Sequence, residues 1–180
     1  MTESEKTTKT DLKPGADAVL PLESDGSGPQ LSMEELLAIP LPNDAVYSAL
    51  IVDDNPSFQK LLSLSLSMQP QIGVIDFANN GVEAIIKAKE KLYDLVFMDA
   101  MMPGIDGYEA CRQLREIPEY KHTPIIMVTG LNSPMDEAKG IIAGTTTYVT
   151  KPVQQMPFKV LLTRELALLN FKKKLRKPDK

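Results

Sequence analysis

The feature that most constrains this chain is a regular alternation of short apolar runs with amphipathic stretches from Val46 onward. The apolar runs are continuous and rich in β-branched or aromatic residues, and they lie at 46–52, 72–77, 95–98, 125–128 and, more weakly, 146–149. Such runs are typical of strands buried on both faces. The stretches between them have helical spacing and lie at 56–68, 81–91, 106–116, 134–143 and from 153 onward. Five strand-then-helix units predict an α/β fold with a parallel sheet and helices on both faces.

The two ends of the chain differ from this central region. Residues 1 to about 30 are rich in Thr, Ser, Gly, Pro and charge, so they are expected to be disordered. Ser32 and Glu35 have the spacing of a capping box, which predicts a short helix over 32–39. That segment is either a transient helix in a flexible tail or a docking segment. The expected divisions are an N-terminal extension over 1–45, a folded domain over 46–162, and a C-terminal helical extension with a basic tail over 163–180.

Composition excludes several classes of protein. The chain has 180 residues, a formal net charge of −4 and a single cysteine, Cys111. This mild charge implies no whole-surface affinity for nucleic acid, and no DNA-binding domain is recognisable. One cysteine cannot form an internal disulfide, which favours a reducing compartment. No stretch approaches the roughly 18 consecutive apolar residues of a membrane span, and the N-terminus lacks the apolar segment of a signal peptide. We therefore expect a cytoplasmic protein.

Polar side chains follow four of the predicted strands at the point where each strand ends. Asp53 and Asp54 follow the first strand, Asp99 the third, Thr129 the fourth and Lys151 the fifth. Ligands of parallel α/β sheets bind at the carboxyl ends of the strands. Three carboxylates, a hydroxyl and an ammonium are therefore predicted to converge on one rim.

A hard cation would explain why three acids share that rim. Mg²⁺ prefers oxygen ligands and completes its shell with water, carboxylates and phosphate oxygens. A metal, a lysine and a hydroxyl together suit a phosphoryl group better than acid–base chemistry. Alone, each residue has an ordinary explanation: either aspartate of the first pair could cap a helix, Asp99 could be a turn acid, and Lys151 could be a surface residue. Their joint placement at the ends of different strands favours the site.

Several motifs carry a resemblance to a known family. They are "IVDDN", "NNGVEAI", "LVFMDAMMPGIDGYEACRQLR", "TPIIMVTG" and "YVTKP", in that order. From about 46 to 162 the chain resembles the receiver domain of two-component response regulators. The resemblance implies a flavodoxin-like, doubly wound, five-stranded parallel sheet of strand order 2-1-3-4-5. It also implies a signalling phosphoacceptor rather than an enzyme, which takes a phosphoryl group on Asp99 from a histidine kinase or a histidine phosphotransfer protein.

The same resemblance implies roles for the residues around Asp99. Mg²⁺ would be held by Asp53, Asp54, Asp99 and the backbone carbonyl of Met101.

The remaining implied roles belong to the later strands. Lys151 would pair with the phosphoryl oxygens, and Thr129 and Tyr148 would form the switch that responds to them. Pro152 is a candidate for a cis peptide bond. Gly130 departs from the family pattern, where the small residue after the threonine is often alanine.

Two further expectations concern phosphate lifetime and partner docking. Met101 and Leu131 occupy the positions that, in receivers, help or hinder the hydrolytic water, and neither can orient a water through a hydrogen bond. The apolar residues of the helix at 56–68 span a wider arc than core packing requires, so some must be exposed. We expect a phosphodonor protein to dock there, with Phe58 or Leu62 near the centre.

Some alternatives remain open from the sequence. The last helix lacks the acidic and arginine pattern of receivers that dimerise to bind DNA, so the oligomeric state is undetermined and could depend on phosphorylation. The chain could be a regulatory domain of a longer effector protein. It could also be a receiver-like interaction module that is never phosphorylated, although such modules tend to lose an acid or the lysine.

Overall fold

The computed structural model describes residues 46–176, so the predicted extension over 1–45, its helix at 32–39 and residues 177–180 lie outside the described part. The strands are β1 (Tyr47–Val52), β2 (Ile72–Ala78), β3 (Leu95–Met98), β4 (Ile125–Thr129) and β5 (Thr147–Thr150). The helices are α2 (Pro56–Ser67), α3 (Gly81–Glu90), α4 (Gly107–Glu116), α5 (Pro134–Ala143) and α6 (Gln155–Arg176), with a 3₁₀ turn, η1 (Pro118–Tyr120), before β4.

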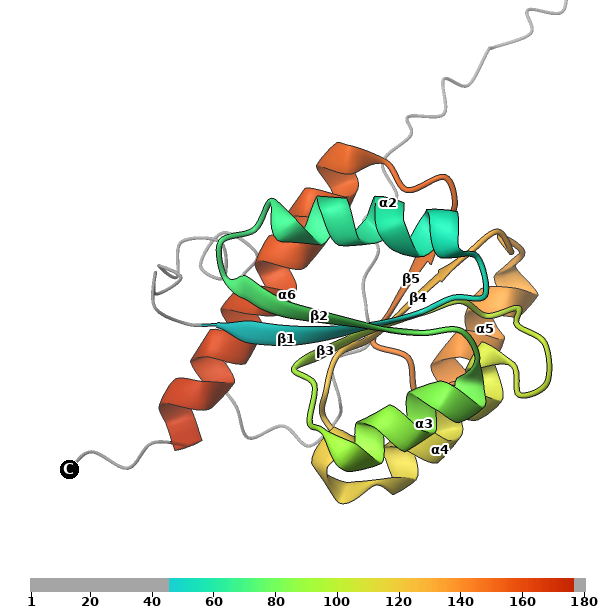
Figure 1. The fold of residues 1–180 in the computed structure, drawn as a ribbon, viewed down its shortest axis with the longest axis horizontal. Helices are drawn as coiled ribbons and strands as arrows, with labels where there is room; N and C mark the ends of the chain where they lie inside the picture. Colours follow the sequence, from blue (N-terminus) through green and yellow to red (C-terminus); the bar gives the residue numbers. More distant parts are fainter. Residues whose placement is uncertain (1–45, 177–180) are drawn as a thin grey trace, which may run out of the picture.

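The five strands form one parallel sheet in the order β2-β1-β3-β4-β5, which confirms the predicted fold and strand order. Helices α2 and α6 cover one face, and α3, α4 and α5 cover the other (Figure 1). Each face has its own apolar core, because successive strand residues point to opposite sides. Leu50 and Met98 point toward α3 and α4, while Ile51 and Phe97 point toward α2 and α6.

Polar caps decide where the helices begin. Four helices start after a side chain that accepts a hydrogen bond from the first turn: Asn55 for α2, Asn80 for α3, Asp106 for α4 and Ser133 for α5. Each cap satisfies an amide that would otherwise lack a partner. The predicted starts were therefore correct to within a residue or two, since the capping side chains are visible in the sequence.

The edge strand β2 carries an acid inside its strand pattern. Asp76 lies at that edge, and its carboxylate forms an ion pair with Lys91 at 2.7 Å. The hydroxyl of Tyr93 also donates to Asp76, at 2.8 Å. A charged, paired side chain on an edge strand opposes pairing with a further strand.

Helix α6 continues well beyond the expected domain boundary at residue 162. Leu166 and Ala167 are fully buried, and Asn170 is only 4% exposed. Near the end of the helix the ammonium of Lys173 lies 2.9 Å from Asp94 and 4.4 Å from the ring centre of Tyr47. The C-terminal half of α6 is therefore part of the domain and not a free connector. No helix among residues 46–176 is long and apolar enough to cross a membrane.

We predict that Leu166→Ala lowers the free energy of unfolding by about 2–5 kcal/mol, because it removes buried methyl groups and leaves a cavity. Val160→Ala, on the same helix but 49% exposed, should change it by less than about 1 kcal/mol. Urea unfolding of the two variants measures the difference. Equal effects would mean that the second half of α6 does not pack on the sheet in solution.

Candidate functional site

The loop after β1 places two aspartates differently. Asp53 is 1% exposed, whereas Asp54 is exposed. Neither caps α2, because the side chain of Asn55 accepts from the amides of Ser57 at 3.0 Å and Phe58 at 3.2 Å. Asp53 instead accepts from the Asn55 amide at 2.8 Å. The capping alternative for the two acids is therefore wrong, and both carboxylates face the rim of the sheet.

Gln59 is a buried site residue that sequence reasoning missed. Its side-chain amide donates to the backbone carbonyls of Asp53 at 2.7 Å and Ala78 at 3.0 Å. These bonds tie the loop after β1 to the end of β2 and fix the backbone that carries the acids. A polar residue on the core side of an otherwise apolar helical face was the available signal, since buried polar groups need partners.

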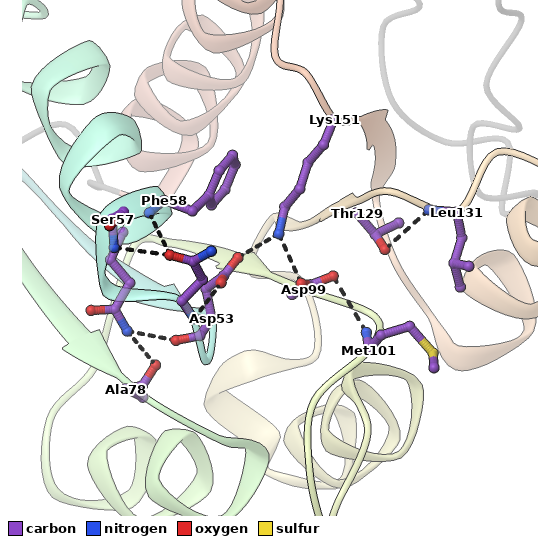
Figure 2. A network of polar contacts seen from close by, with 11 residues as sticks. Asp53, Ser57, Phe58, Ala78, Asp99, Met101, Thr129, Leu131 and Lys151 are labelled. Atoms are coloured by element: carbon purple, nitrogen blue, oxygen red, sulfur yellow. Dashed lines mark hydrogen bonds and ion pairs between the residues drawn. The ribbon is translucent and has the colours of Figure 1, made fainter.

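Asp99 lies at the centre of the rim. It is 8% exposed, and its amide donates to the carbonyl of Val52 at 2.8 Å, so the sheet ladder carries it to the level of Asp53. The ammonium of Lys151 lies between the two acids, 2.6 Å from Asp53 and 2.8 Å from Asp99 (Figure 2). Gly107 allows this arrangement, because a Cβ there would lie 2.0 Å from the carbonyl oxygen of Asp99.

Burial and pairing act against each other at this ion pair. Desolvation raises the pKa of Asp53, and the charge of Asp99 adds to the rise, although hydrogen bonds from Lys151 and Asn55 oppose it. Desolvation lowers the pKa of Lys151, but its hydrogen bonds to Asp53 and Asp99 outweigh burial and raise it overall. The ammonium of Lys151 stays charged, but Asp53 and Asp99 share it. Its charge therefore does not fully offset the desolvation of the Asp53 carboxylate. The stabilising contribution of Asp53 without metal therefore falls as the pH rises from its ordinary pKa through the raised one.

The acids fit a divalent cation. Carboxylate oxygens of Asp53, Asp54 and Asp99 lie within 4.8 Å of one another. Three carboxylates and one ammonium leave two formal negative charges in excess, which a divalent cation would balance. Hard oxygen donors with one exposed side open to water are the ligands that Mg²⁺ prefers. Asp53, Asp54 and Asp99 are therefore the residues that would hold the metal.

The two switch candidates are Thr129 and Tyr148, and Thr129 lies on the side of Asp99 away from Asp53 (Figure 2). Thr129 is 1% exposed, and its hydroxyl accepts from the amide of Leu131 at 3.4 Å. The ring of Tyr148 packs against the core beneath α4 and α5, and its hydroxyl donates to the carbonyl of Leu131 at 3.1 Å. Tyr148 is therefore turned inward. The Lys151–Pro152 peptide bond is cis, which confirms the expectation for Pro152.

Met101 and Leu131 line one hollow of about 300 Å³. Its other lining residues come from the loop before α4 and from α4 and α5. The amide of Met101 donates to Asp99 at 3.3 Å, while its side chain is 60% exposed. In Figure 2 both side chains lie on the side of Asp99 away from Asp53. Met101 and Leu131 therefore present apolar side chains on that side of Asp99.

The expected docking helix is exposed in part. Leu61 and Leu64 are each 58% exposed, which confirms that the apolar arc of α2 is too wide for the core. Leu62 is only 2% exposed, so the prediction that it could centre the exposed surface is wrong: it faces the sheet, one helical step of about 100° from Leu61. Phe58 is half-buried, and its ring centre lies 4.0 Å from the ammonium of Lys151.

Comparison with known proteins decides the family. The family model of the response regulator receiver domain matches residues 49–162. The chain belongs to this family. Receiver domains of this family act in two-component signal transduction, which agrees with the acid cluster, the lysine and the threonine at the rim.

Relatives come from several bacteria. The transcriptional regulatory protein ResD of Bacillus subtilis is 46% identical over 103 residues, covering 57% of this receiver chain and 41% of the relative. The histidine-protein kinase BarA of Escherichia coli is 30% identical over 129 residues, covering 72% of this chain and 14% of the kinase. The chain thus spans less than half the length of the curated relatives it matches.

Solved receiver structures have the same fold. The chemotaxis protein CheY4 of Vibrio cholerae matches with a TM-score of 0.62 and 31% identity, covering 67% of this chain and 98% of CheY4. The receiver domain of the sensor histidine kinase PA1611 of Pseudomonas aeruginosa matches with a TM-score of 0.61 and 28% identity, covering 68% of this chain and 98% of that domain. The PA1611 receiver was solved with a magnesium ion coordinated in its active-site cleft.

Proposed function

We propose that this receiver accepts a phosphoryl group on Asp99 from a histidine kinase or a histidine phosphotransfer protein, in a Mg²⁺-dependent step. The observation that carries the proposal is the position of Lys151, which bridges buried Asp53 and Asp99 while Asp54 completes a cluster of acids within 4.8 Å. Burying a lysine between two carboxylates at the end of a sheet costs desolvation free energy. That cost is explained if the ammonium of Lys151 stabilises the negative charge of a phosphoryl group on Asp99.

The chemistry needs little from the protein beyond positioning. A carboxylate oxygen of Asp99 attacks phosphorus and the P–N bond to the donor imidazole breaks. The imidazole takes the bonding electron pair and, because its other ring nitrogen is protonated, leaves as the neutral ring while an acyl phosphate forms on Asp99. Bound Mg²⁺, held by Asp53, Asp54, Asp99 and the Met101 carbonyl, would neutralise charge on the transferring oxygens. Lys151 exchanges its contact with Asp99 for a phosphoryl oxygen. The protein makes and slowly hydrolyses its own acyl phosphate and is not otherwise an enzyme.

We predict that acetyl phosphate with Mg²⁺ adds one phosphoryl group to the wild type, and that Asp99→Asn abolishes the addition because the attacking oxygen is lost. Intact-protein mass spectrometry, followed by borohydride reduction and peptide mapping, measures the site. Asp106→Asn is the matched control, since Asp106 is an exposed aspartate that caps α4. Labelling of the Asp99→Asn variant, or of the wild type in excess EDTA, would contradict the proposal.

The new charge would act on Thr129 and Tyr148. The hydroxyl of Thr129 lies at the end of β4, beside the strand that carries Asp99, where it can donate to a phosphoryl oxygen. Its movement would shift the loop at Leu131, against which the Tyr148 hydroxyl rests at 3.1 Å. This is a local electrostatic event read out by a two-state side chain.

The phosphodonor would dock on α2, where Phe58 and exposed Leu61 border a small hollow shared with Val153 and Gln155. We predict that Leu61→Ala slows phosphotransfer from a phosphorylated histidine phosphotransfer protein by roughly 5- to 30-fold, the scale of a lost interface anchor. Labelling by acetyl phosphate should change less than about 2-fold, because this small donor needs no docking surface.

Two matched variants sharpen the docking test. Phe58→Ala should slow transfer from the partner protein more than labelling by acetyl phosphate, although its ring also covers the ammonium of Lys151. Val82→Ala removes a 47% exposed side chain from α3, on the opposite face of the sheet, and should affect neither donor. Equal losses with both donors in Leu61→Ala would exclude docking on α2.

The setting of the protein follows from this function. We place it in the cytoplasm, where histidine kinases present their phosphohistidine, and its one cysteine is buried and unpaired with another cysteine. Because the match covers only 26% of PleD and 14% of BarA, a receiver of this kind could also regulate a larger effector protein. Measuring the mass of the native gene product distinguishes the two cases.

A further inference from the structure

The side chain of Tyr148 lies in a socket formed by Leu131, Tyr108 and Gly140. Its hydroxyl donates to the carbonyl of Leu131 at 3.1 Å and lies 3.4 Å from the hydroxyl of Tyr108. The Tyr108 hydroxyl also lies 3.3 Å from the carbonyl of Asp136, in the first turn of α5. Tyr108 itself is 7% exposed on α4. The inward ring is therefore held at its tip by the Leu131 carbonyl and by the Tyr108 hydroxyl, whose single proton goes either to Tyr148 or to the carbonyl of Asp136 on α5.

The flank of the ring is shaped by a glycine. Gly140 is the seventh residue of α5, where glycine is a poor helix former compared with alanine. A Cβ at Gly140 would lie 3.1 Å from Oγ1 of Thr145, 3.2 Å from Cδ2 of Tyr148 and 3.6 Å from Cε2 of Tyr148. The first two distances are tighter than an ordinary van der Waals contact. The ring therefore fits inward as it does because residue 140 has no side chain.

We propose that Tyr108 and Gly140 form a socket that holds Tyr148 inward without a phosphoryl group, so that Tyr108 is a positioning residue of the switch. This inference rests on the proposed role of Tyr148 as the switch. The hydroxyl contact with Tyr108 and the missing methyl group at Gly140 both favour the inward position of the Tyr148 ring over the outward one. A phosphoryl group on Asp99 would favour the same position. The unphosphorylated receiver would then already populate the surface that its target recognises.

The socket also links Thr129, at the end of β4, to two helices. The Thr129 hydroxyl touches the Leu131 amide, the Leu131 carbonyl accepts from Tyr148, and Tyr148 meets Tyr108. Linkage is reciprocal, so a change that favours the inward ring must favour phosphorylation, and a change that disfavours it must oppose phosphorylation. Tyr108 can therefore set the response without touching the phosphoryl group.

The test follows the position of the Tyr148 ring in the full chain without any phosphodonor. With ¹³C-labelled tyrosine, the ring of Tyr148, assigned by Tyr148→Phe, should give nuclear Overhauser contacts to the α-protons of Gly140. Tyr108→Phe keeps the ring but removes the hydroxyl, and should lower the inward-to-outward ratio by roughly 3- to 10-fold, as expected for one hydrogen bond. Tyr93→Phe removes a hydroxyl that bonds Asp76 at 2.8 Å, far from the socket, and should leave Tyr148 unchanged.

Gly140→Ala supplies an independent arm. It should reduce the same contacts of the Tyr148 ring, and it should lower the melting temperature or leave it unchanged despite the better helix former. In a Tyr148→Ala background the same substitution should be clearly less destabilising, because the ring is gone and only Thr145 Oγ1 remains close to the new Cβ. An unmoved Tyr148 ring in Tyr108→Phe, or equal effects of Gly140→Ala in both backgrounds, would overturn the proposal. Because no phosphodonor is used, failure of Asp99 to accept a phosphoryl group would leave this result unaffected.

Discussion

Asp54→Asn is expected to reduce Mg²⁺-dependent labelling of Asp99 to background, while the metal-free fold stays at least as stable as the wild type. Asp54 is exposed, and its carboxylate completes the acid cluster with Asp53 and Asp99. Removing one of three like charges relieves repulsion in the absence of metal. The same change removes a metal ligand, and the phosphoryl transfer depends on that metal.

Two measurements separate the metal from the fold in this variant. Thermal melts without Mg²⁺ should give a melting temperature equal to or above that of the wild type. Adding Mg²⁺ should raise the wild-type melting temperature, by the equivalent of about 2.7 kcal/mol at 100 times its Kd, and should hardly change that of Asp54→Asn.

Glu116→Gln is the control for the loss of one charge, since Glu116 is exposed at the last turn of α4. It should respond to Mg²⁺ like the wild type. A large loss of metal-free stability in Asp54→Asn alone would mean that the acids are structural and that the site has another use.

Met101→Asn combined with Leu131→Glu is expected to speed loss of the phosphoryl group from Asp99 by roughly 10-fold, the scale on which a polar group begins to position a reactant. Hydrolysis needs a water in line with phosphorus, opposite the Asp99 oxygen. Met101 and Leu131 lie on one side of Asp99, and their side chains offer no group that can orient such a water. The wild-type phosphoprotein should therefore be long-lived among receivers, which suits a sustained output or a pool drained by a separate phosphatase.

The measurement is the decay of label from purified phosphoprotein in excess Mg²⁺. Met101→Leu combined with Leu131→Met changes the same two positions without adding a polar group, so its decay should stay within about 2-fold of the wild type. Unchanged or slower decay in the polar double variant would place control of the water elsewhere in the site.

Much of the site was predictable because parallel strands bring their carboxyl ends to one edge. Once the apolar runs are assigned to strands, Asp53, Asp99 and Lys151 must lie at the same edge of the sheet. The long side chain of Lys151 then spans the distance from β5 to the end of β1, three strands away. Local sequence also determined most helix starts, since a capping side chain such as Asn80 or Ser133 acts on amides two or three residues away.

The tertiary structure decided what depends on contacts between distant segments. Leu61 and Leu62 are equally apolar, but only the direction of α2 over the sheet makes one exposed and the other buried. The burial of Leu166 depends on how far α6 runs beneath the sheet, which its own pattern does not reveal. Gln59 and Tyr108 gain their roles from carbonyls and hydroxyls 19 to 40 residues away. The sequence by itself determined which polar residues lie at the ends of the strands, because the alternation of strands and helices brings those ends to one edge. The partners of a side chain on another helix or strand depend on packing, which only the assembled fold specifies.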